Sequence, residues 1–563
     1  MQTQTPTLPL RALVVEFNKG QIQLPQFQRD YVWRPRKIRN LLDSLWRGYP
    51  IGGFYLWRPT GIALDPRPKA IGTTQIGPQF VGYLIDGQQR LTSLEAAFGL
   101  YSGEDKRGDE LRCYLDLATL DSERRRDTRL FVTYSGNRRI ARRVDDGDPA
   151  LIPLKELFEG QNQDLRRKTE ESLRLRSGWS AKQIDAAMAR FDQASKMLDQ
   201  LVPCTTVSEI SDKDAVVVFD RLNKGGTQLR QGDVRAAELA RGTAVTVLKH
   251  MREFVSGERP QRLGFGFSFA FRALVVFHRE SAQFATLKED WMEAPGPDGR
   301  SLQQSWKATE RAVAEVLEFA DKKMGWSRRL LLPSANALIV LAAAMDRLNF
   351  RFTPNDEQLF RRWLCLTALR GVFQGSVETT INRFLRAIKD RRRSPAQALV
   401  ASLRRDEGRP IRADELLRSS HLWGPAIQVM HAWLVNLDAR DWLETDRTID
   451  ALARTASDST PGGDLTVHHI FARRVLSDLL VDADIVNRPA NFGLLSRSTN
   501  SEFGDKRPDE VLAMLTPNQR KAASGQFFGT EAGDRLRVEN YEVFCQWRAS
   551  RLAEGLNVFI GLK

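Results

Sequence analysis

Two histidines, His468 and His469, stand side by side in the mostly apolar stretch LTVHHIFARRVL. One imidazole can take a proton from water, and a second imidazole together with an amide oxygen can hold a divalent cation against a phosphate. Asn491 follows within NFGLL and Asn500 within SRSTN, and Lys506 comes shortly after them. The types and the order of these residues suit metal-dependent cleavage of a phosphodiester.

Adjacent side chains on a regular strand point to opposite faces, so both histidines could serve one site only where the strand ends in a loop or a bulge. A histidine pair by itself is also typical of a half-buried structural strand. Two asparagines, whose amide oxygens suit a divalent cation, follow within about 30 residues, and the pattern therefore favours the catalytic interpretation.

A second group of polar residues lies near the N-terminus, in the motifs LPQFQRDYVW (24–33), LIDGQQRLTSL (84–94) and FDRLNKGGTQL (219–229). In the second motif an apolar strand ends at Asp86-Gly87, and helical spacing restarts at Leu91. The N–H groups that open this helix could bind an anion, and Arg90 could add charge-assisted bonds to a phosphate. DGQQR alone is more often an ordinary polar turn between a strand and a helix. Since the chain has no GxxxxGK[ST] segment, nucleotide hydrolysis would not use Walker chemistry, and Mg²⁺ would rest on phosphate oxygens and one or two protein oxygens.

The elements that must position these residues divide the chain into three sections. Residues 1–240 mix short strand-like runs with helical patches and predict an α+β domain. Residues 241–440 show apolar residues at three- and four-residue spacing, as expected of a helical bundle or connector. A Pro/Gly break at positions 461–463 precedes the histidine pair, and we expect residues 441–563 to form a separate C-terminal domain.

Composition points to a polyanionic partner, because 84 Lys and Arg exceed 70 Asp and Glu and give a net charge of +14. Double-stranded DNA is the expected partner. Arginine clusters at 124–126, 138–139, 142–143 and 391–393 could follow its phosphate backbone.

The four cysteines are far apart, which favours a reducing cytoplasm over a disulfide framework or a zinc site. We expect no membrane insertion, since the longest apolar run is far shorter than the ~20 residues of a membrane helix. We read the other histidines, at 250, 278, 421 and 431, as ordinary packing or surface residues.

Taken together, the three N-terminal motifs resemble the N-terminal domain of the GmrSD family of modification-dependent restriction proteins, in the order FQRxYxW, DGQQR and FxRLNxxGxxL. The resemblance implies a ParB/sulfiredoxin-like fold that binds a nucleoside triphosphate with Mg²⁺. Tyr31 and Trp33 are expected to be packing groups, and Asp220 could lie beside the metal-binding amide of Asn223. The implied nucleotide-site residues are Gln28, Arg29, Asp86, Gly87, Gln88, Gln89, Arg90, Asn223, Lys224 and Gly225.

The histidine segment resembles the HNH, or ββα-metal, nuclease domain that forms the C-terminal part of the same family. The resemblance implies that His469 is the general base, that His468 and Asn500 hold Mg²⁺ or Mn²⁺, and that Asn491 orients the base through a hydrogen bond. Lys506 would contact phosphate. The family's usual Pro after the His-Ile pair is replaced here by Phe471-Ala472, which leaves the geometry of this loop open.

The combined expectation is an α+β multidomain chain with a ParB/sulfiredoxin-like N-terminal domain, a helical middle section and an HNH C-terminal domain. Such a chain would be a modification-dependent DNA endonuclease acting against phage DNA in the cytoplasm, regulated by nucleotide. Two alternatives remain: a nucleotide-dependent DNA-binding regulator with a non-catalytic HNH remnant, and a nonspecific nuclease toxin triggered by nucleotide. A homodimer is left open, as are the DNA modification and the nucleotide.

Overall fold

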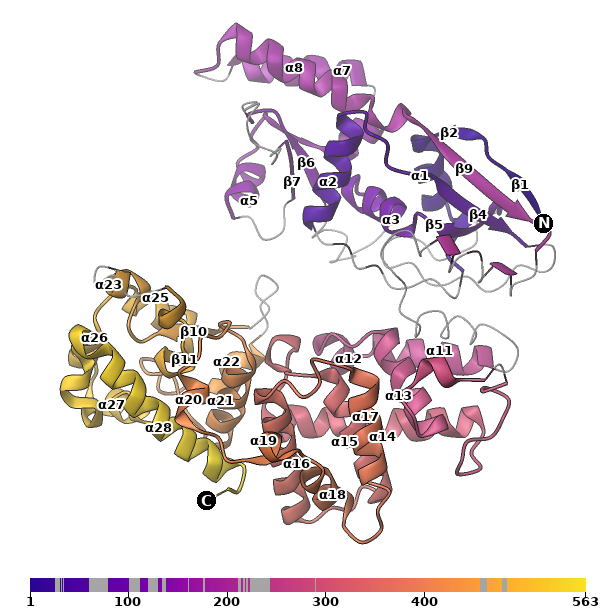
Figure 1. Cartoon of the computed structure of the whole chain (residues 1–563). Coiled ribbons are helices and arrows are strands. Elements are labelled where there is room, and N and C mark those ends of the chain that lie inside the picture. The colour runs from indigo at the N-terminus through magenta and orange to yellow at the C-terminus, as the bar shows by residue number, and fades with distance from the viewer. Residues whose placement is uncertain are drawn as a thin grey trace. The chain divides into compact units, whose positions relative to one another are not determined.

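Two units make up the chain, residues 1–240 and residues 241–563. The computed structural model describes residues 1–25, 31, 33, 35–59, 79–100, 112–119, 130–133, 138–159, 162–175, 178–210, 214–215, 218, 221–222, 244–288, 290–455, 463–477 and 483–562. Strands gather mainly in the first unit, and helices dominate the second (Figure 1). This mixture of helices and small sheets agrees with the α+β composition expected from the sequence.

The first unit contains a six-stranded mixed sheet in the order β1-β9-β4-β5-β3, with β2 also paired to β9. Its strands are β1 (Gln2–Gln4), β2 (Thr7–Pro9), β3 (Ile22–Gln23), β4 (Phe54–Arg58), β5 (Gly82–Asp86) and β9 (Leu201–Ser208). Strand β4 runs parallel to β9 and antiparallel to β5, while β3 runs parallel to β5. Strand β5 therefore lies between β4 and β3, and its last residue, Asp86, pairs with Tyr55 of β4.

Alternation along these strands gives the sheet two apolar faces. Leu56 and Leu84 join a core with the helices α1 (Leu10–Asn18), α2 (Pro35–Trp46) and α3 (Gln88–Ala97). Trp57, Tyr83 and Ile85 point to the other face, where they form a smaller cluster. Both faces of β4 and β5 are thus covered by apolar side chains.

A second, three-stranded antiparallel sheet completes the first unit, in the order β7-β6-β8. Its strands are β6 (Cys113–Asp116), β7 (Phe131–Thr133) and β8 (Leu151–Pro153), and the helices around it are α5 (Arg138–Asp145), α6 (Leu154–Glu159), α7 (Asn162–Leu175), α8 (Ala181–Ser195) and the 3₁₀ turn η1 (Met197–Asp199). Arg143, from one of the arginine clusters, pairs with Asp116 and Asp148 at 2.7 Å each. It is consequently engaged within the protein.

The second unit begins as a helical array. Its helices are α11 (Ala244–Ser256), α12 (Glu258–Arg262), α13 (Phe267–Arg279), α14 (Leu302–Met324), α15 (Ala335–Arg347), α16 (Pro354–Leu369), α17 (Val377–Ala387), α18 (Pro395–Ala401), α19 (Arg405–Gly408), α20 (Ala413–Leu416), α21 (Pro425–Asn436) and α22 (Ile449–Arg454), with the 3₁₀ turns η2 (Phe284–Thr286) and η3 (Arg329–Leu331). Ser301, Thr353 and Ser394 form capping boxes that start α14, α16 and α18. Among the described residues, no helix is long and apolar enough to cross a membrane. The four cysteines are unpaired and buried.

The C-terminal part of this unit holds the histidine pair. It contains the hairpin of β10 (Leu465–His469) and β11 (Phe492–Ser496), the helices α23 (Arg473–Ser477), α24 (Ala483–Val486), α25 (Arg497–Phe503), α26 (Pro508–Met514), α27 (Pro517–Ser524) and α28 (Tyr541–Phe559), and the turns η4 (Pro489–Asn491), η5 (Thr530–Leu536) and η6 (Val538–Asn540). One continuous apolar core runs from Leu263 to Ile560. Residues 241–440 and 441–563 therefore share a core.

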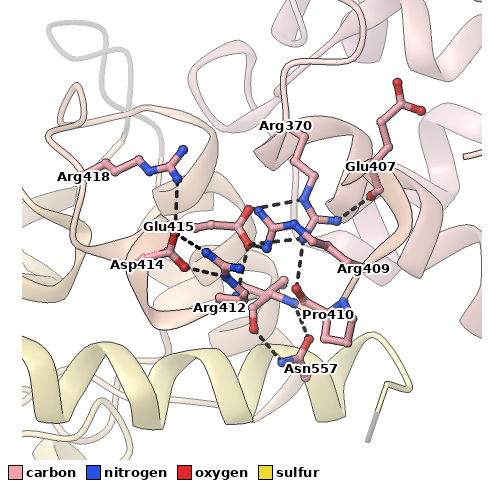
Figure 2. Close-up of polar contacts among 10 residues, drawn as sticks. Arg370, Glu407, Arg409, Pro410, Arg412, Asp414, Glu415, Arg418 and Asn557 are labelled. Atoms are coloured by element: carbon pink, nitrogen blue, oxygen red, sulfur yellow. Dashed lines mark hydrogen bonds and ion pairs between the residues drawn. The ribbon is translucent and has the colours of Figure 1, made fainter. Parts of the chain in front are cut away.

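Polar contacts also join the two parts of the second unit (Figure 2). Arg370, at the end of α16, donates to both carboxylate oxygens of Glu415 in α20, and Arg409 donates to the same carboxylate at 2.9 Å. Asn557 of α28 exchanges two hydrogen bonds with the backbone of Ile411, at 2.8 and 2.9 Å. The last helix of the chain is thus fixed to the helical section.

Candidate functional site

The hairpin and the helix after it bring His468 and Asn500 together. Strands β10 and β11 pair in regular antiparallel register, with His468 opposite Gly493 and His469 opposite Phe492. Helix α25 follows β11 directly, so Asn500 is carried back to β10. The Nδ1 atom of His468 lies 2.8 Å from the Oδ1 atom of Asn500. These two residues lie in contact although 32 positions separate them.

The His468 ring is buried between aromatic side chains. It packs edge-on against Trp442 at 6.2 Å between ring centroids and lies 5.6 Å from the ring of Phe503. This burial lowers the pKa of His468 to about 4. The imidazole is therefore neutral at neutral pH and has a lone pair to offer a metal ion.

Helix α25 is held in place by a buried carboxylate. Asp441 accepts hydrogen bonds from the backbone N–H of Ser496, at 2.6 Å, and from the hydroxyl of Thr499. Ser496 itself caps the helix by accepting from the Thr499 N–H at 3.1 Å. Asp441 also accepts from two backbone N–H groups that follow it, at 2.9 and 3.0 Å. Asp441 consequently fixes the helix that carries Asn500.

His469 has different neighbours from His468, as alternation on a regular strand requires. Its ring meets Phe492 edge-on at 5.0 Å, and its Nε2 atom lies 3.1 Å from the Oδ1 atom of Asn487. Arg473 donates from Nη2 to the same oxygen at 2.7 Å. Burial lowers the pKa of His469, against the opposing effect of the Asn487 bond. The ring is neutral at neutral pH and able to accept a proton.

Asn491 does not make the hydrogen bond to His469 that the sequence comparison implied. Its Oδ1 atom accepts from the N–H of Phe471 at 2.8 Å, and its Nδ2 atom donates to the carbonyls of Phe471 and Val486 at 3.1 Å each. The side-chain NH₂ and carbonyl of Asn491 thus form hydrogen bonds with backbone groups, and the side chain is fully buried. Asn491 holds the loop after β10, which settles the geometry that the missing proline had left open.

Lys506 lies beyond the end of α25, and its ammonium donates to the carbonyl of Glu502. No contact to either histidine is formed within the described part of the chain. Sequence reasoning missed Asn487 and Arg473, which contact the histidine site directly. The only signal for Asn487 was the NRPAN segment between the strands, in which Asn487 precedes Asn491 by four positions, and Arg473 lies outside this segment.

The donor set of His468 and Asn500 suits one divalent cation. The 2.8 Å contact is a hydrogen bond from the His468 Nδ1–H to the amide oxygen of Asn500. With the ring proton on Nε2 instead, this nitrogen and oxygen would lie close to the separation of about 3.0 Å that neighbouring ligands of an octahedral ion with 2.1 Å bonds require. No cluster of three or more His, Cys, Asp or Glu that could hold a metal occurs among the residues the structure describes. Because both ligands are neutral, phosphate oxygens and water would have to complete the coordination.

The DGQQR motif forms a tight turn from β5 into α3 in the first unit. Gly87 adopts φ +105°, and a Cβ atom there would lie 2.3 Å from the Phe54 ring. Only glycine fits this position, for both reasons. Gln88 and Gln89 are buried at the start of α3, whereas Asp86 is partly exposed at the end of β5.

Arg90, a predicted nucleotide-site residue, contacts neighbouring groups of the protein. Its guanidinium donates to the carbonyls of Ile51 and Gly53 at 2.7 Å each and to Asp86 at 3.1 Å. The guanidinium also lies over the Phe54 ring at 4.6 Å, and burial lowers its pKa. Arg90 ties the loop before β4 to the turn after β5.

The described residues of the other N-terminal motifs meet the same region. Tyr31 is buried, with its hydroxyl 2.9 Å from that of Ser93 in α3. The Trp33 side chain packs against the same core, and its backbone N–H donates to Gln89. This confirms the expected packing role of the two aromatic residues. Leu222 packs against the cluster that contains Ile85. Gln28, Arg29, Asp220, Asn223, Lys224 and Gly225 lie outside the described residues.

The remaining histidines are packing or surface residues in the structure. His278 is buried with hydrogen bonds to Ser305 and the carbonyl of Trp291, and His431 is buried in α21. His250 and His421 are exposed.

Comparison with known proteins identifies the first unit. Residues 11–240 match the family model described as the N-terminal domain of the GmrSD restriction endonuclease. An uncharacterized protein of Methanocaldococcus jannaschii is 32% identical over 113 residues, which cover 18% of this chain and 18% of that protein. The chain thus spans less than a fifth of the length of this relative. All three N-terminal motifs fall inside this match, so residues 11–240 are similar to the N-terminal domain of the GmrSD restriction endonuclease.

Proposed function

We propose that this protein is a metal-dependent DNA endonuclease of the modification-dependent restriction type, with an HNH cleavage site in its second unit. The observation that carries the proposal is the contact of His468 on β10 with Asn500 on α25, at 2.8 Å, in a strand–strand–helix arrangement. The restriction endonuclease family of the first unit and the net charge of +14 both support DNA as the substrate.

In this proposal His469 is the general base. It takes a proton from a water molecule, the water oxygen bonds to phosphorus, and the leaving alkoxide departs and takes a proton from solvent. His468 and Asn500 would hold Mg²⁺ or Mn²⁺, which stabilises the charge on the phosphate and the leaving oxygen. Asn491 keeps the loop after His469 in shape through its three backbone bonds. Lys506 remains a candidate phosphate contact.

The first unit would bind a nucleoside triphosphate with Mg²⁺ and control cutting, in a ParB/sulfiredoxin-like manner. The turn at Gly87 supports this role, because it opens helix α3, and backbone N–H groups at the start of a helix can bind an anion. Asp86, Gly87, Gln88, Gln89 and Arg90 stay the candidates for nucleotide contact, together with Gln28, Arg29 and the 223–225 segment. Arg90 would position the turn.

Cleavage of a plasmid panel tests the proposal. Unmodified, glucosylated-hydroxymethylated and phosphorothioated plasmids are incubated with the full chain and Mg²⁺, with and without nucleoside triphosphates. We expect cutting of one modified plasmid, a fall of about 10²-fold or more in His469→Ala, and wild-type activity in the exposed control His421→Ala. The family resemblance implies that the recognised DNA carries either a modified base or a modified backbone.

Two other outcomes would contradict the proposal. Cutting of unmodified DNA as soon as nucleotide is added would identify a nonspecific nuclease. No cutting of any plasmid, together with salt-sensitive DNA binding that His469→Ala leaves unchanged, would identify a DNA-binding regulator.

A further inference from the structure

We infer that Asn487 and Arg473 form a positioning pair that selects the tautomer of His469 and so determines which ring nitrogen acts as the base. The inference rests on the proposed function for its catalytic meaning, but the tautomer itself is a property of the free protein. It assigns roles to two residues that lie outside the histidine and asparagine pattern.

The Arg473 guanidinium defines the orientation of the Asn487 amide. Arginine has only hydrogen-bond donors, so the Asn487 atom that lies 2.7 Å from Arg473 Nη2 must be the oxygen. The opposite orientation would place the amide NH₂ against the guanidinium. Arg473 is exposed at the start of α23, where it can reach this oxygen without burial of its charge.

The oriented amide then defines the tautomer of His469. The same Oδ1 atom lies 3.1 Å from His469 Nε2 and can only accept, so the neutral ring must carry its proton on Nε2. The lone pair is left on Nδ1, which is the atom that takes the proton from water. After proton transfer, Asn487 still accepts from Nε2 and steadies the imidazolium.

Contacts of residues 485, 487 and 488 hold the backbone around Asn487, so the side-chain amide of Asn487 keeps its position beside His469. The carbonyl of Ile485 accepts from the Tyr541 hydroxyl at 2.8 Å, and the carbonyl of Asn487 accepts from the Ser420 N–H at 2.7 Å. Arg488 pairs with Glu542 at 2.6 Å. Helix α28 and the loop before α21 therefore hold this segment against the hairpin.

The tautomer is measured directly by nitrogen NMR of the full chain labelled with ¹⁵N-histidine, without DNA and at a pH where His469 is neutral. The resonances are assigned with His469→Gln. We expect a protonated Nε2 in the wild type, a mixture of tautomers in Asn487→Leu and Arg473→Met, and the wild-type pattern in Arg474→Met. Arg474 is the matched control, since it is an exposed neighbour whose carbonyl, and not its guanidinium, accepts a side-chain hydrogen bond, from the Ser477 hydroxyl.

Steady-state cleavage kinetics gives the catalytic consequence. Asn487→Leu should lower kcat by about 10²-fold with little change in KM, whereas Asn487→Asp, which keeps the accepting oxygen, should stay within about fivefold of wild type. A protonated Nδ1 in the wild type, or an unchanged spectrum in Asn487→Leu, overturns the inference while leaving the nuclease proposal intact. If no DNA is cut, the spectra still decide the tautomer, and the proposed function is what fails.

Discussion

At the scale of single residues, Asn487 and Asn491 show how the same side chain serves two purposes four positions apart. Asn491 is fully buried, and its side-chain amide forms hydrogen bonds with the backbone of Phe471 and Val486. Asn487 is half-buried and directs its oxygen to a histidine and an arginine. Asn491 is therefore structural, because its hydrogen bonds go to the backbone of the surrounding loop. Asn487 is a positioning residue, because its oxygen contacts His469.

His431 is a residue whose titration should limit stability at low pH. It is fully buried in α21, and neither ring nitrogen has a hydrogen-bond partner in the part of the chain described. Burial lowers its pKa to about 3, with a smaller effect of Arg454. Since the unfolded chain binds a proton near pH 6.5 and the folded chain does not, the contribution of His431 to folding falls as the pH drops from about 6.5 towards 3.

The expected size is about 2 kcal/mol of unfolding free energy between pH 7.5 and pH 5. Urea unfolding of the full chain at the two pH values should show this loss in the wild type and its removal in His431→Leu. The exposed His421→Leu serves as control and should keep the wild-type difference. Equal pH dependence of wild type and His431→Leu would contradict the prediction.

At the scale of elements, the turn from β5 into α3 and the hairpin with α25 each place polar residues at a junction between a strand and a helix. The first junction depends on a glycine conformation, and the second depends on the buried carboxylate of Asp441. In both, long-range contacts complete the junction: Arg90 joins the loop at 51–53 to the turn, and Asp441 joins α25 to the chain before α22.

Gly87→Ala should strongly destabilise the first unit. The substitution combines an unfavourable φ of +105° with a Cβ atom 2.3 Å from Phe54, so we expect a loss of about 3 kcal/mol or more. Gly48→Ala is the matched control, because Gly48 also has positive φ, +71°, but faces open space. It should cost about 1 kcal/mol. Thermal unfolding of the two variants checks the difference, and similar midpoints would show that the Phe54 contact is unimportant.

At the scale of the whole molecule, the proposed nuclease site depends on the helices before it. The core of the second unit is continuous from Leu263 to Ile560, and Ser420 and Asn557 connect the two parts of this unit through hydrogen bonds. The position of Asn487 is thereby tied to the helical section. A change of packing among these helices would move Ser420, whose N–H donates to the Asn487 carbonyl, and thereby the Asn487 side chain that contacts His469.

Fragments of the chain should show this dependence. Residues 241–563 are expected to unfold cooperatively as a single unit, because they hold the whole core. Residues 441–563 alone would expose the apolar surface that now packs on the helical section, and we expect them to remain unfolded. Circular dichroism and limited proteolysis of both fragments make the comparison. A cooperative transition in the shorter fragment would show that the C-terminal part is an independent domain.

Much of the candidate site follows from the sequence by itself. The histidine pair, the order of Asn491 and Asn500, and the three N-terminal motifs are local patterns, and residue types together with short spacing determine what chemistry they could support. The strand that ends at Asp86 and the helix that restarts before Leu91 are also local, because hydrophobic periodicity and a glycine between them are enough to predict the turn.

Tertiary structure alone decided the partner of each polar group. Whether Asn491 or Asn487 meets His469, and whether Arg90 points outward or into the loop at 51–53, depends on contacts between segments distant in sequence. Pairing of β10 with β11 aligns residues 23 or more positions apart, and the core shared across position 440 draws on helices hundreds of residues apart. Such contacts arise from the packing of whole elements, and a buried polar group takes the partner that this packing supplies, since burial without one is costly.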